Sequence, residues 1–334
     1  MNILVIGYGS IGKRHAHNIH KLGHVPILLR HKKTQQNLEG FAEYYRFSTA
    51  VSQCALDGAI ICSPTAMHIS DVKKCINHKI PFLLEKPPTP DLQTTQELLQ
   101  LIHENMPVKY DIGLNLRYYP PLQFIKEYLP QLGQIYSAQI SVGYYLPYWR
   151  QNIDYRKSSS AKKELGGGVH IELIHDLDYA LWFFGYPEKT FGQVHKVSNL
   201  DISTDDLCSI HLNYENGSLI ELHLDYLSHS YQRHCRIIAE NGTMTWDMNE
   251  HTVCYTKRGE TQPIALYTLP IDYDINQTYI DELTHFIHII KDDDQPTISV
   301  NHIQEMMRIV NAIERSSQEE KSIYLKEIKY PSEE

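Results

Sequence analysis

Membrane-spanning runs and basic charge are both scarce in this 334-residue chain, and each absence excludes a class of protein. No apolar run approaches the roughly 20 residues that cross a bilayer, and the opening MNILVIGYG lacks the basic segment of a signal peptide. The formal net charge of −9 argues against the clustered basic face of a nucleic-acid-binding protein. We therefore expect a protein of the cytoplasm with no membrane or nucleic-acid partner.

Paired cysteines are also missing. The six cysteines are scattered and none forms a Cys-x-x-Cys pair, which predicts reduced thiols and argues against a disulfide framework or a zinc site. The chain is long enough for two domains of the usual ~100–200 residues each. Because the residue pattern changes near position 120, we predict one domain over 1–119 and a second over 120–334.

The first recognisable motif is a glycine-rich turn near the N-terminus. A buried-strand pattern in NILVI leads directly to Gly7, Gly9 and Gly12, spaced as G-x-G-x-x-G, and a helical pattern follows up to Gly23. In this spacing the first glycine permits a tight turn, the second lets backbone amides approach a pyrophosphate, and the third allows close helix–strand packing. The motif predicts dinucleotide binding, with an ordinary strand-to-helix turn as the alternative.

Further apolar runs of strand length lie at 57–64, 80–86 and 110–118, and helical patterns separate the early ones. This alternation predicts an α/β domain of Rossmann type, with a doubly wound parallel sheet that binds ligands beyond the carboxyl ends of its strands. The run at 80–86 ends in LLEKPPTP, where Lys86 precedes two prolines. Because proline fixes the backbone, we expect this lysine to be held rigidly at the ligand edge.

The end of the second predicted strand carries cations where an acid is usual. A NAD-specific fold has an Asp or Glu there that binds the ribose 2′-hydroxyl. In this chain Arg30, His31, Lys32 and Lys33 follow the strand, and no carboxylate appears before Glu39. We therefore predict NADP in preference to NAD, with a solvated charge run as the alternative interpretation.

After about residue 120 the sequence becomes a series of Tyr-rich alternating stretches. Asn-Gly pairs at 216–217 and 241–242 separate apolar alternations, which is a strong signal for β-hairpins. The second domain is therefore predicted to be α+β, with an open antiparallel β-sheet and helices. A sheet with one uncovered face commonly needs a partner, so we expect a homodimer or homotetramer through this sheet.

One stretch of this half is helical. The segment GGGVHIELIHDLDYALWFFG, 166–185, has an apolar stripe at helical spacing and ends at Gly185. Glu172 and His175 are three residues apart and would share a face of one continuous helix. His170 lies off that face and the i, i+4 pairing of helical zinc sites is missing, so we predict no metal. The alternative to a catalytic His175 is a satisfied, half-buried histidine.

Together these segments resemble one protein family. The glycine motif at 7–12, the triplet Glu85-Lys86-Pro87, LNLRYYP at 114–120 and the helix at 166–185 follow the order found in the Gfo/Idh/MocA oxidoreductases. That family is named for glucose–fructose oxidoreductase and inositol dehydrogenase, and the similarity runs from residue 1 to about residue 315. The stretch 143–168 resembles a branch associated with bacterial surface-sugar biosynthesis.

The resemblance implies roles for three residues. It implies that Lys86 lies beside the nicotinamide and the substrate, and that His175 exchanges the proton of the reacting hydroxyl. Many family members carry an aspartate four residues before this histidine, where the chain has Ile171. Glu172 is the candidate third catalytic group in its place. The bond from Lys86 to Pro87 is a candidate for the cis form, which costs an X–Pro bond only about 0.5–1 kcal/mol.

The other candidate site residues form two groups. The dinucleotide-binding candidates are Gly7, Gly9, Ser10, Ile11, Gly12, Arg30, His31, Ser63, Pro64, His68, Glu85, Lys86 and Asn115. The substrate-binding candidates are Arg117, Tyr118, Trp149, Arg150, Tyr155, Arg156 and His170. The predicted reaction is hydride transfer between NAD(P) and a carbon of a sugar or nucleotide-sugar. An NAD-dependent glycosidase and a redox sensor without turnover are the alternatives.

Overall fold

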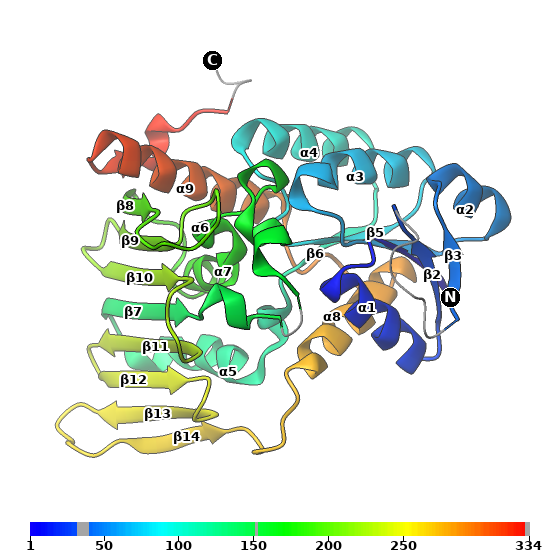
Figure 1. Ribbon diagram of the computed structural model, residues 1–334. Coiled ribbons are helices and arrows are strands. Elements are labelled where there is room, and N and C mark those ends of the chain that lie inside the picture. The colour runs from blue at the N-terminus through cyan, green and yellow to red at the C-terminus, as the bar shows by residue number, and fades with distance from the viewer. Residues whose placement is uncertain (32–39, 151–152, 331–334) are drawn as a thin grey trace. The chain divides into compact units, whose positions relative to one another are not determined.

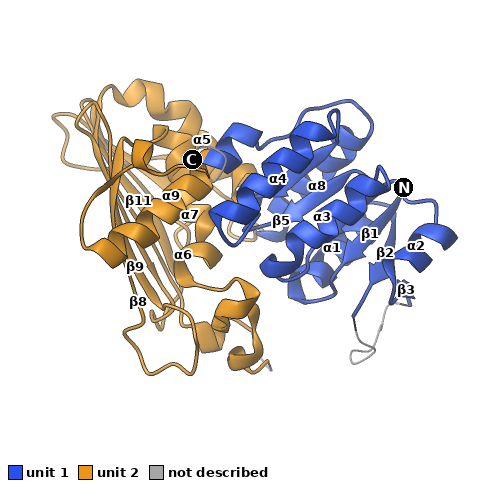
Figure 2. Cartoon of the chain, turned by 90° about the horizontal axis from the view of Figure 1, so that it is seen from above, with its two compact units in different colours: residues 1–115, 275–304 blue, residues 116–274, 305–334 orange. Residues whose placement is uncertain are grey.

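The chain forms two compact units in the computed structural model, which describes residues 1–31, 40–150 and 153–330. Residues 1–115 and 275–304 make the first unit, and residues 116–274 and 305–334 are assigned to the second (Figure 2). The second domain predicted from the sequence, 120–334, includes 275–304. The segment belongs to the first unit because it contains a helix that completes the hydrophobic core there.

The first unit is built on a parallel six-stranded sheet with the strand order β3-β2-β1-β4-β5-β6. The strands are β1 (Asn2–Ile6), β2 (Val25–Leu29), β3 (Ala42–Tyr44), β4 (Gly58–Ile61), β5 (Phe82–Glu85) and β6 (Tyr110–Gly113). This order is that of a Rossmann fold and confirms the predicted doubly wound sheet. The short strand β3 carries only three residues and was not predicted, because it lacks a run of apolar side chains.

Helices cover both faces of this sheet, as a sheet with apolar strands requires. They are α1 (Ser10–Lys21), α2 (Phe47–Gln53), α3 (His68–Asn77), α4 (Leu92–Glu104) and α8 (Asn276–Ile290). In Figure 1, α1 and α8 lie on one face, and α3 and α4 lie on the other. Helix α8 packs Leu283, Phe286 and Ile287 against Ile3 and Leu83 of the strands. Helix α8 therefore belongs to the Rossmann core although it is distant in sequence.

The second unit contains a nine-stranded sheet with the order β14-β13-β12-β11-β7-β10-β9-β8-β15. Its strands are β7 (Ile135–Gly143), β8 (Lys189–His195), β9 (Leu207–Asn213), β10 (Leu219–Asp225), β11 (Gln232–Ala239), β12 (Gly242–Asp247), β13 (Thr252–Lys257), β14 (Ile264–Thr268) and β15 (Ile323–Tyr324). The predicted hairpins form between β9 and β10 and between β11 and β12. The sheet is mixed, because β10 pairs with β7 in parallel. The prediction of a purely antiparallel sheet is wrong at that pair.

The helices of the second unit are α5 (Pro120–Tyr128), α6 (Val169–Glu172) and α7 (Ile174–Phe184), together with most of α9 (Val300–Glu319). The continuous helix predicted over 166–185 is interrupted at Leu173, whose φ and ψ are −93° and 26°. The amide of Leu173 donates to the Val169 carbonyl, but the amide of Asp176 donates to the carbonyl of Leu173 itself. The hydrogen-bond ladder is therefore reset between Glu172 and His175.

Two buried ion pairs fix α7 within the second unit. Arg233 of β11 donates to Asp176 at 3.0 Å, and Arg117 donates two hydrogen bonds of 2.7 Å to Asp178. Removing one partner of such a buried pair leaves an uncompensated charge and costs about 3–5 kcal/mol. These pairs hold in place the helix that begins beside His175. Within the described residues, no helix is long and apolar enough to cross a membrane.

Candidate active site

The glycine-rich turn between β1 and α1 has the shape that a dinucleotide needs. A Cβ on Gly12 would lie 2.0 Å from the carbonyl oxygen of Gly7, so only glycine fits there. Gly7 has a φ of +96° and would bring a Cβ to 2.7 Å from the Cys62 carbonyl oxygen. Around a Cβ on Gly9 there is no heavy atom of the described residues within 4 Å. Packing therefore explains two of the glycines, and open space for a ligand explains the third.

Helix α1 begins directly at this open space. Ser10 and Ile11 are its first residues, and its N-cap is Gly9, which has no side chain to bind the helix amides. Free amides at a helix N-terminus bind anions such as the pyrophosphate of a dinucleotide. The residues present therefore fit the dinucleotide that the fold implies, held by Gly7 to Gly12 and the first turn of α1.

The end of β2 differs from the expectation that favoured NADP. The Arg30 side chain is only 4% exposed, donates to Glu43 of β3 at 2.7 Å and lies over the Tyr8 ring. His31 is exposed, and Lys32, Lys33 and Glu39 lie outside the described residues. Glu43 went unnoticed in the sequence because it reaches Arg30 only through the pairing of β2 with β3.

The loops after β4 and β5 are joined by a buried histidine. The Ser63 hydroxyl donates to Asp71 at 2.7 Å. His68, which is 1% exposed, lies with Nε2 at 2.9 Å from the Ser63 carbonyl oxygen and Nδ1 at 3.2 Å from the Pro88 carbonyl oxygen. Burial lowers the pKa of His68 and favours its neutral form. The loop that contains Pro64 is thereby tied to the loop that follows Lys86.

Lys86 stands at the carboxyl end of β5, partly exposed, between a buried acid and two buried prolines. Its peptide bond to Pro87 is cis, which confirms the prediction. Its own amide donates to Glu85 Oε2 at 3.2 Å, and Glu85 Oε1 lies 2.7 Å from His15 Nε2. Asn115, just beyond β6, is buried and donates to the Thr278 hydroxyl of α8 at 2.7 Å. The amide of Asn115 therefore has a structural partner in α8.

Glu172 and His175 lie on two successive helices, α6 and α7, and not on one. The Ser160 hydroxyl donates to Glu172 Oε1 at 3.1 Å, and Glu172 is half-buried. His175 is 8% exposed and lies in the first turn of α7, next to the buried Asp176. Burial and, after it, the nearby Glu172 carboxylate raise the pKa of Tyr226. The short turn that carries Ser160 therefore lies against Glu172.

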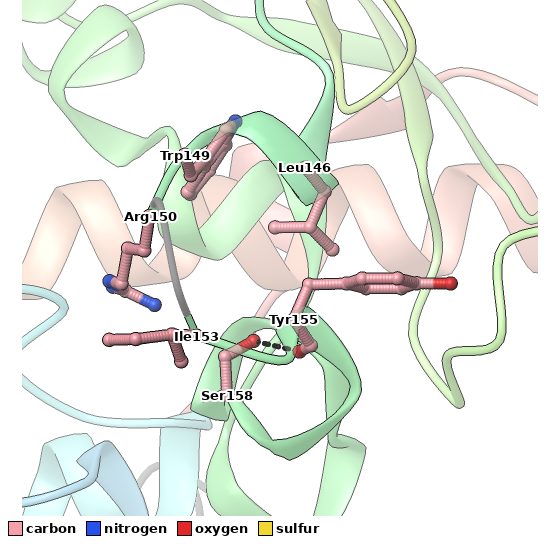
Figure 3. A pocket seen from close by; sticks show the side chains of 6 residues that line it. All are labelled: Leu146, Trp149, Arg150, Ile153, Tyr155 and Ser158. Carbon is pink, nitrogen blue, oxygen red and sulfur yellow. Dashed lines mark hydrogen bonds between the residues drawn. The ribbon is translucent and has the colours of Figure 1, made fainter.

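A small pocket lies beside this turn (Figure 3). It is lined by Leu146, Trp149, Arg150, Ile153, Tyr155 and Ser158. The structure thus brings three of the predicted substrate residues together. Figure 3 shows Arg150 extending beside Ile153, while the Ser158 hydroxyl donates to the Tyr155 carbonyl at 2.6 Å. The Trp149 indole donates to the Tyr144 carbonyl at 2.8 Å and packs edge-on against Tyr226.

The remaining predicted substrate residues are engaged elsewhere. The guanidinium of Arg117 is bound by Asp178, as described above, and that of Arg156 is bound by Asp154 at 2.8 and 2.9 Å. His170 Nε2 lies 2.9 Å from Glu314 Oε1 of α9. Tyr118 is half-buried at the end of a short turn, 115–118. The partner of Arg117 could not be assigned from sequence, because Asp178 lies 61 residues further along the chain.

Two family profiles match the chain. The profile described as "Oxidoreductase family, NAD-binding Rossmann fold" matches residues 1–110, and the "GFO/IDH/MocA C-terminal domain" profile matches residues 130–245. The class that fold and site define is an NAD-binding oxidoreductase. The chain belongs to the Gfo/Idh/MocA family, which confirms the family and the fold that the sequence predicted.

The chain is similar to several proteins along nearly its whole length. It is 23% identical over 345 residues to the myo-inositol 2-dehydrogenase of Thermotoga maritima, covering 98% of this chain and 99% of that one. It is 23% identical over 327 residues to the 4-carboxy-2-hydroxymuconate-6-semialdehyde dehydrogenase of a Sphingobium species, covering 94% and 98%. Levoglucosan dehydrogenase in complex with NADH shares the fold, with a TM-score of 0.84 at 14% identity, covering 97% and 99%.

The two kinds of glycine in the turn give a matched pair of variants. Gly12→Ala should lower the thermal unfolding midpoint by several degrees, because its methyl group meets a backbone carbonyl that cannot yield cheaply. Gly9→Ala should leave the midpoint within about 1 °C but weaken NAD(H) binding by about tenfold, because its methyl group enters open space. Calorimetry and cofactor titration measure both effects. Equal loss of stability in the two variants would contradict this explanation.

Proposed function

We propose that the protein is an NAD(H)-dependent dehydrogenase of a polyhydroxylated substrate, a sugar, a cyclic polyol or a nucleotide-sugar. The observation that carries the proposal is Lys86, which directly follows the hydrogen-bonded Glu85 at the carboxyl end of β5. A redox sensor would need no such residue at the ligand edge. Once bound, the dinucleotide supplies a nicotinamide that accepts or gives a hydride.

Lys86 and His175 are proposed as the two catalytic residues. In this proposal Lys86 orients and polarises the reacting oxygen, and His175 takes or returns its proton. An imidazole ordinarily has a pKa of about 6.5 and a glutamate carboxyl group one of about 4.3. The imidazole is therefore better suited to exchange a proton with a hydroxyl at neutral pH. Glu172 is proposed to bind a substrate hydroxyl. Its place on a separate helix, α6, supports a role distinct from that of His175.

The substrate class is supported by the relatives and by the pocket in the second unit. Two proteins that resemble the chain are dehydrogenases of myo-inositol and of levoglucosan. An indole and a guanidinium, from Trp149 and Arg150, line the pocket, and such groups bind sugar faces and phosphates or carboxylates. We retain the surface-sugar pathway as the proposed setting. The six cysteines are all free thiols, which supports a reducing compartment such as the cytoplasm.

For the cofactor we propose NAD(H) and not NADP(H). The ion pair with Glu43 neutralises Arg30, the first cation of the basic run, and the arginine side chain is buried. A 2′-phosphate near this carboxylate would meet like charge, whereas a ribose hydroxyl would not. The comparison with levoglucosan dehydrogenase, solved with NADH, points the same way.

We also propose that two copies associate through the outer face of the nine-stranded sheet. That face carries half-exposed polar side chains, alternating with the buried residues of β7, β10 and β11. One row across the strands runs Arg236, Gln139, Glu221 and His211. In two copies related by a twofold axis, such rows run in opposite directions. The Arg236 of each copy can then lie near the Glu221 of the other.

The catalytic assignment predicts three different kinetic outcomes. Lys86→Ala should lower turnover about 10²-fold or more while the NAD(H) dissociation constant stays within about threefold. His175→Asn should lower turnover strongly and remove the limb of the pH–rate profile near neutrality. Glu172→Gln should mainly raise KM for the substrate.

The assay is a polyol and sugar panel with NAD(H) followed spectroscopically, and Lys21→Ala, an exposed lysine of α1, is the matched control. Full turnover in Lys86→Ala would refute the assignment. Hydrolysis products without accumulating NADH would favour the glycosidase alternative, and NAD(H) binding without turnover would favour the sensor.

The cofactor proposal predicts that wild-type protein binds NAD(H) more tightly than NADP(H). Glu43→Gln should shift the preference toward NADP(H) by about tenfold, because it removes the carboxylate that neutralises Arg30. The shift should shrink at high salt, where ionic contacts are screened. Glu104→Gln, on the exposed end of α4, is the control. If Glu43→Gln changes the affinities for NAD(H) and NADP(H) equally, the ion pair does not determine the cofactor preference.

The association proposal predicts a dimer or a larger assembly in sedimentation at micromolar concentration. Glu221→Arg should weaken association by about tenfold or more through like-charge contact, and adding Arg236→Glu should restore it. A monomeric wild-type protein would refute the proposal. So would a double variant that is no better associated than the single one.

A further inference from the structure

A cluster of three buried titratable side chains lies inside the first unit, directly behind Lys86. His15 comes from α1, Glu85 from the end of β5 and Glu282 from α8, and they are 0%, 5% and 1% exposed. One ligand-type atom from each lies within 4.8 Å of the other two. Two carboxyl groups at this separation, both out of water, cannot both be ionised without a large electrostatic cost.

Glu85 has the partners that an ionised carboxylate needs. Its Oε1 lies 2.7 Å from His15 Nε2, and its Oε2 accepts the Lys86 amide at 3.2 Å. His15 Nδ1 is buried and has no hydrogen-bond partner among the described residues, so a neutral imidazole with its proton on Nε2 is the form that fits. The carboxyl group also rests on β6, where a Cβ on Gly113 would lie 3.2 Å from Oε2. Glu85 is therefore held on three sides.

Glu282 has none of these partners. Both of its carboxyl oxygens are buried, and neither has a hydrogen-bond partner among the described residues. Burial first, and then the charges of Glu85 and Asp111, raise the pKa of Glu282 well above its usual value. A protonated carboxyl group can stay there at lower cost than a carboxylate, because it carries no charge.

Among the described residues, the charged groups that act most on Glu282 are themselves acids. Asp111 of β6 is buried, with His285 of α8 at 3.7 Å from its Oδ2. Burial raises the pKa of Asp111, and burial together with Glu85 and Glu282 raises that of the Cys62 thiol. Tyr279, one turn before Glu282 on α8, also has a raised pKa because it is buried, and the Arg14 guanidinium lies over its ring at 4.5 Å. The titratable groups around Glu282 are thus His15, Cys62, Glu85, Asp111, Tyr279 and His285.

A metal ion is the other way to hold this cluster, since one imidazole and two carboxylates are ligands that zinc or manganese accepts. The geometry favours the proton. The 2.7 Å contact between His15 and Glu85 is a short hydrogen bond that a metal would have to replace.

We propose that Glu282 is a resident protonated carboxyl group that leaves Glu85 as the one ionised acid of the cluster, and that Glu85 with His15 positions Lys86. Glu85 is then a positioning residue, because it acts through the backbone amide of Lys86. The hydrogen bond from His15 also ties α1, which begins at the glycine-rich turn, to β5, which ends directly before Lys86. The positioning role of Glu85 rests on the proposed catalytic role of Lys86. The protonated state of Glu282 does not depend on that role.

The protonation of Glu282 has a signature in stability. An unfolded glutamate ordinarily titrates near ~4.3, so above that pH the unfolded chain releases a proton that the native protein retains. The contribution of Glu282 to the stability of the folded protein should therefore fall as pH rises from about 5 to 8. Glu282→Gln removes this loss and keeps the shape. It should raise the unfolding midpoint at pH 8 by about 2 °C or more, with a smaller gain at pH 5.

Calorimetry of the wild-type protein and Glu282→Gln across this pH range is the first experiment, with Glu104→Gln as the exposed control on α4. Metal content is measured on the same samples by mass spectrometry, and infrared difference spectra report the carbonyl stretch of a protonated carboxyl group. We expect that band at pH 8 in the wild type and its loss in Glu282→Gln. A stoichiometric metal lost with a lower midpoint in Glu282→Gln would overturn the proposal. A wild-type protein without the band would do the same even if the variant failed to fold.

The second experiment tests positioning by a double-mutant cycle. Glu85→Gln should lower turnover about tenfold while NAD(H) binding stays within about threefold. In a Lys86→Ala background the same change should lower turnover no further, because Glu85 acts only through Lys86. Losses that multiply would overturn the positioning role. If Lys86→Ala itself kept full turnover, the proposed function would fail, while the calorimetric and infrared results would still decide the state of Glu282.

Discussion

The buried hydrogen bond between His15 and Glu85 is the interaction on which the organisation of the first unit depends. It joins α1, which starts at the glycine-rich turn, to β5, which ends directly before Lys86. A charged acceptor in the interior is tolerated only when its oxygens are satisfied, and here an imidazole and a backbone amide satisfy them. Gly113 leaves room for the carboxyl group, so three elements agree on one position for it.

The second unit solves a similar problem with arginines. Helix α7, which begins beside His175, carries two buried aspartates in its first two turns. Arg233 from the sheet and Arg117 from the segment before α5 pair with them. These residues stabilise the position of the helix, and the predicted substrate residue Arg117 is held in an ion pair with Asp178. Trp149 and Arg150, which line a pocket of this unit, stay candidates for substrate contacts beside His175 and Glu172.

Several features could be predicted because they depend on local sequence. The parallel strands are apolar runs of the right length, the glycine turn has a fixed spacing, and the two Asn-Gly pairs select hairpins. The interruption at Leu173 could not be predicted in this way. The apolar stripe continues through it, and only the packing of two short helices moves Glu172 and His175 onto separate axes.

Sequence alone determined the family, the parallel sheet of the first unit and the place of Lys86 directly after an apolar strand, because short-range patterns of glycine, proline and apolar residues encode them. Only the tertiary structure decided which charges meet. Glu43 reaches Arg30 across a strand pairing, α8 brings Glu282 to Glu85 from almost two hundred residues away, and β10 joins β7 in parallel. Each of these depends on contacts between segments distant in sequence, and one sequence contains no local pattern that reports them.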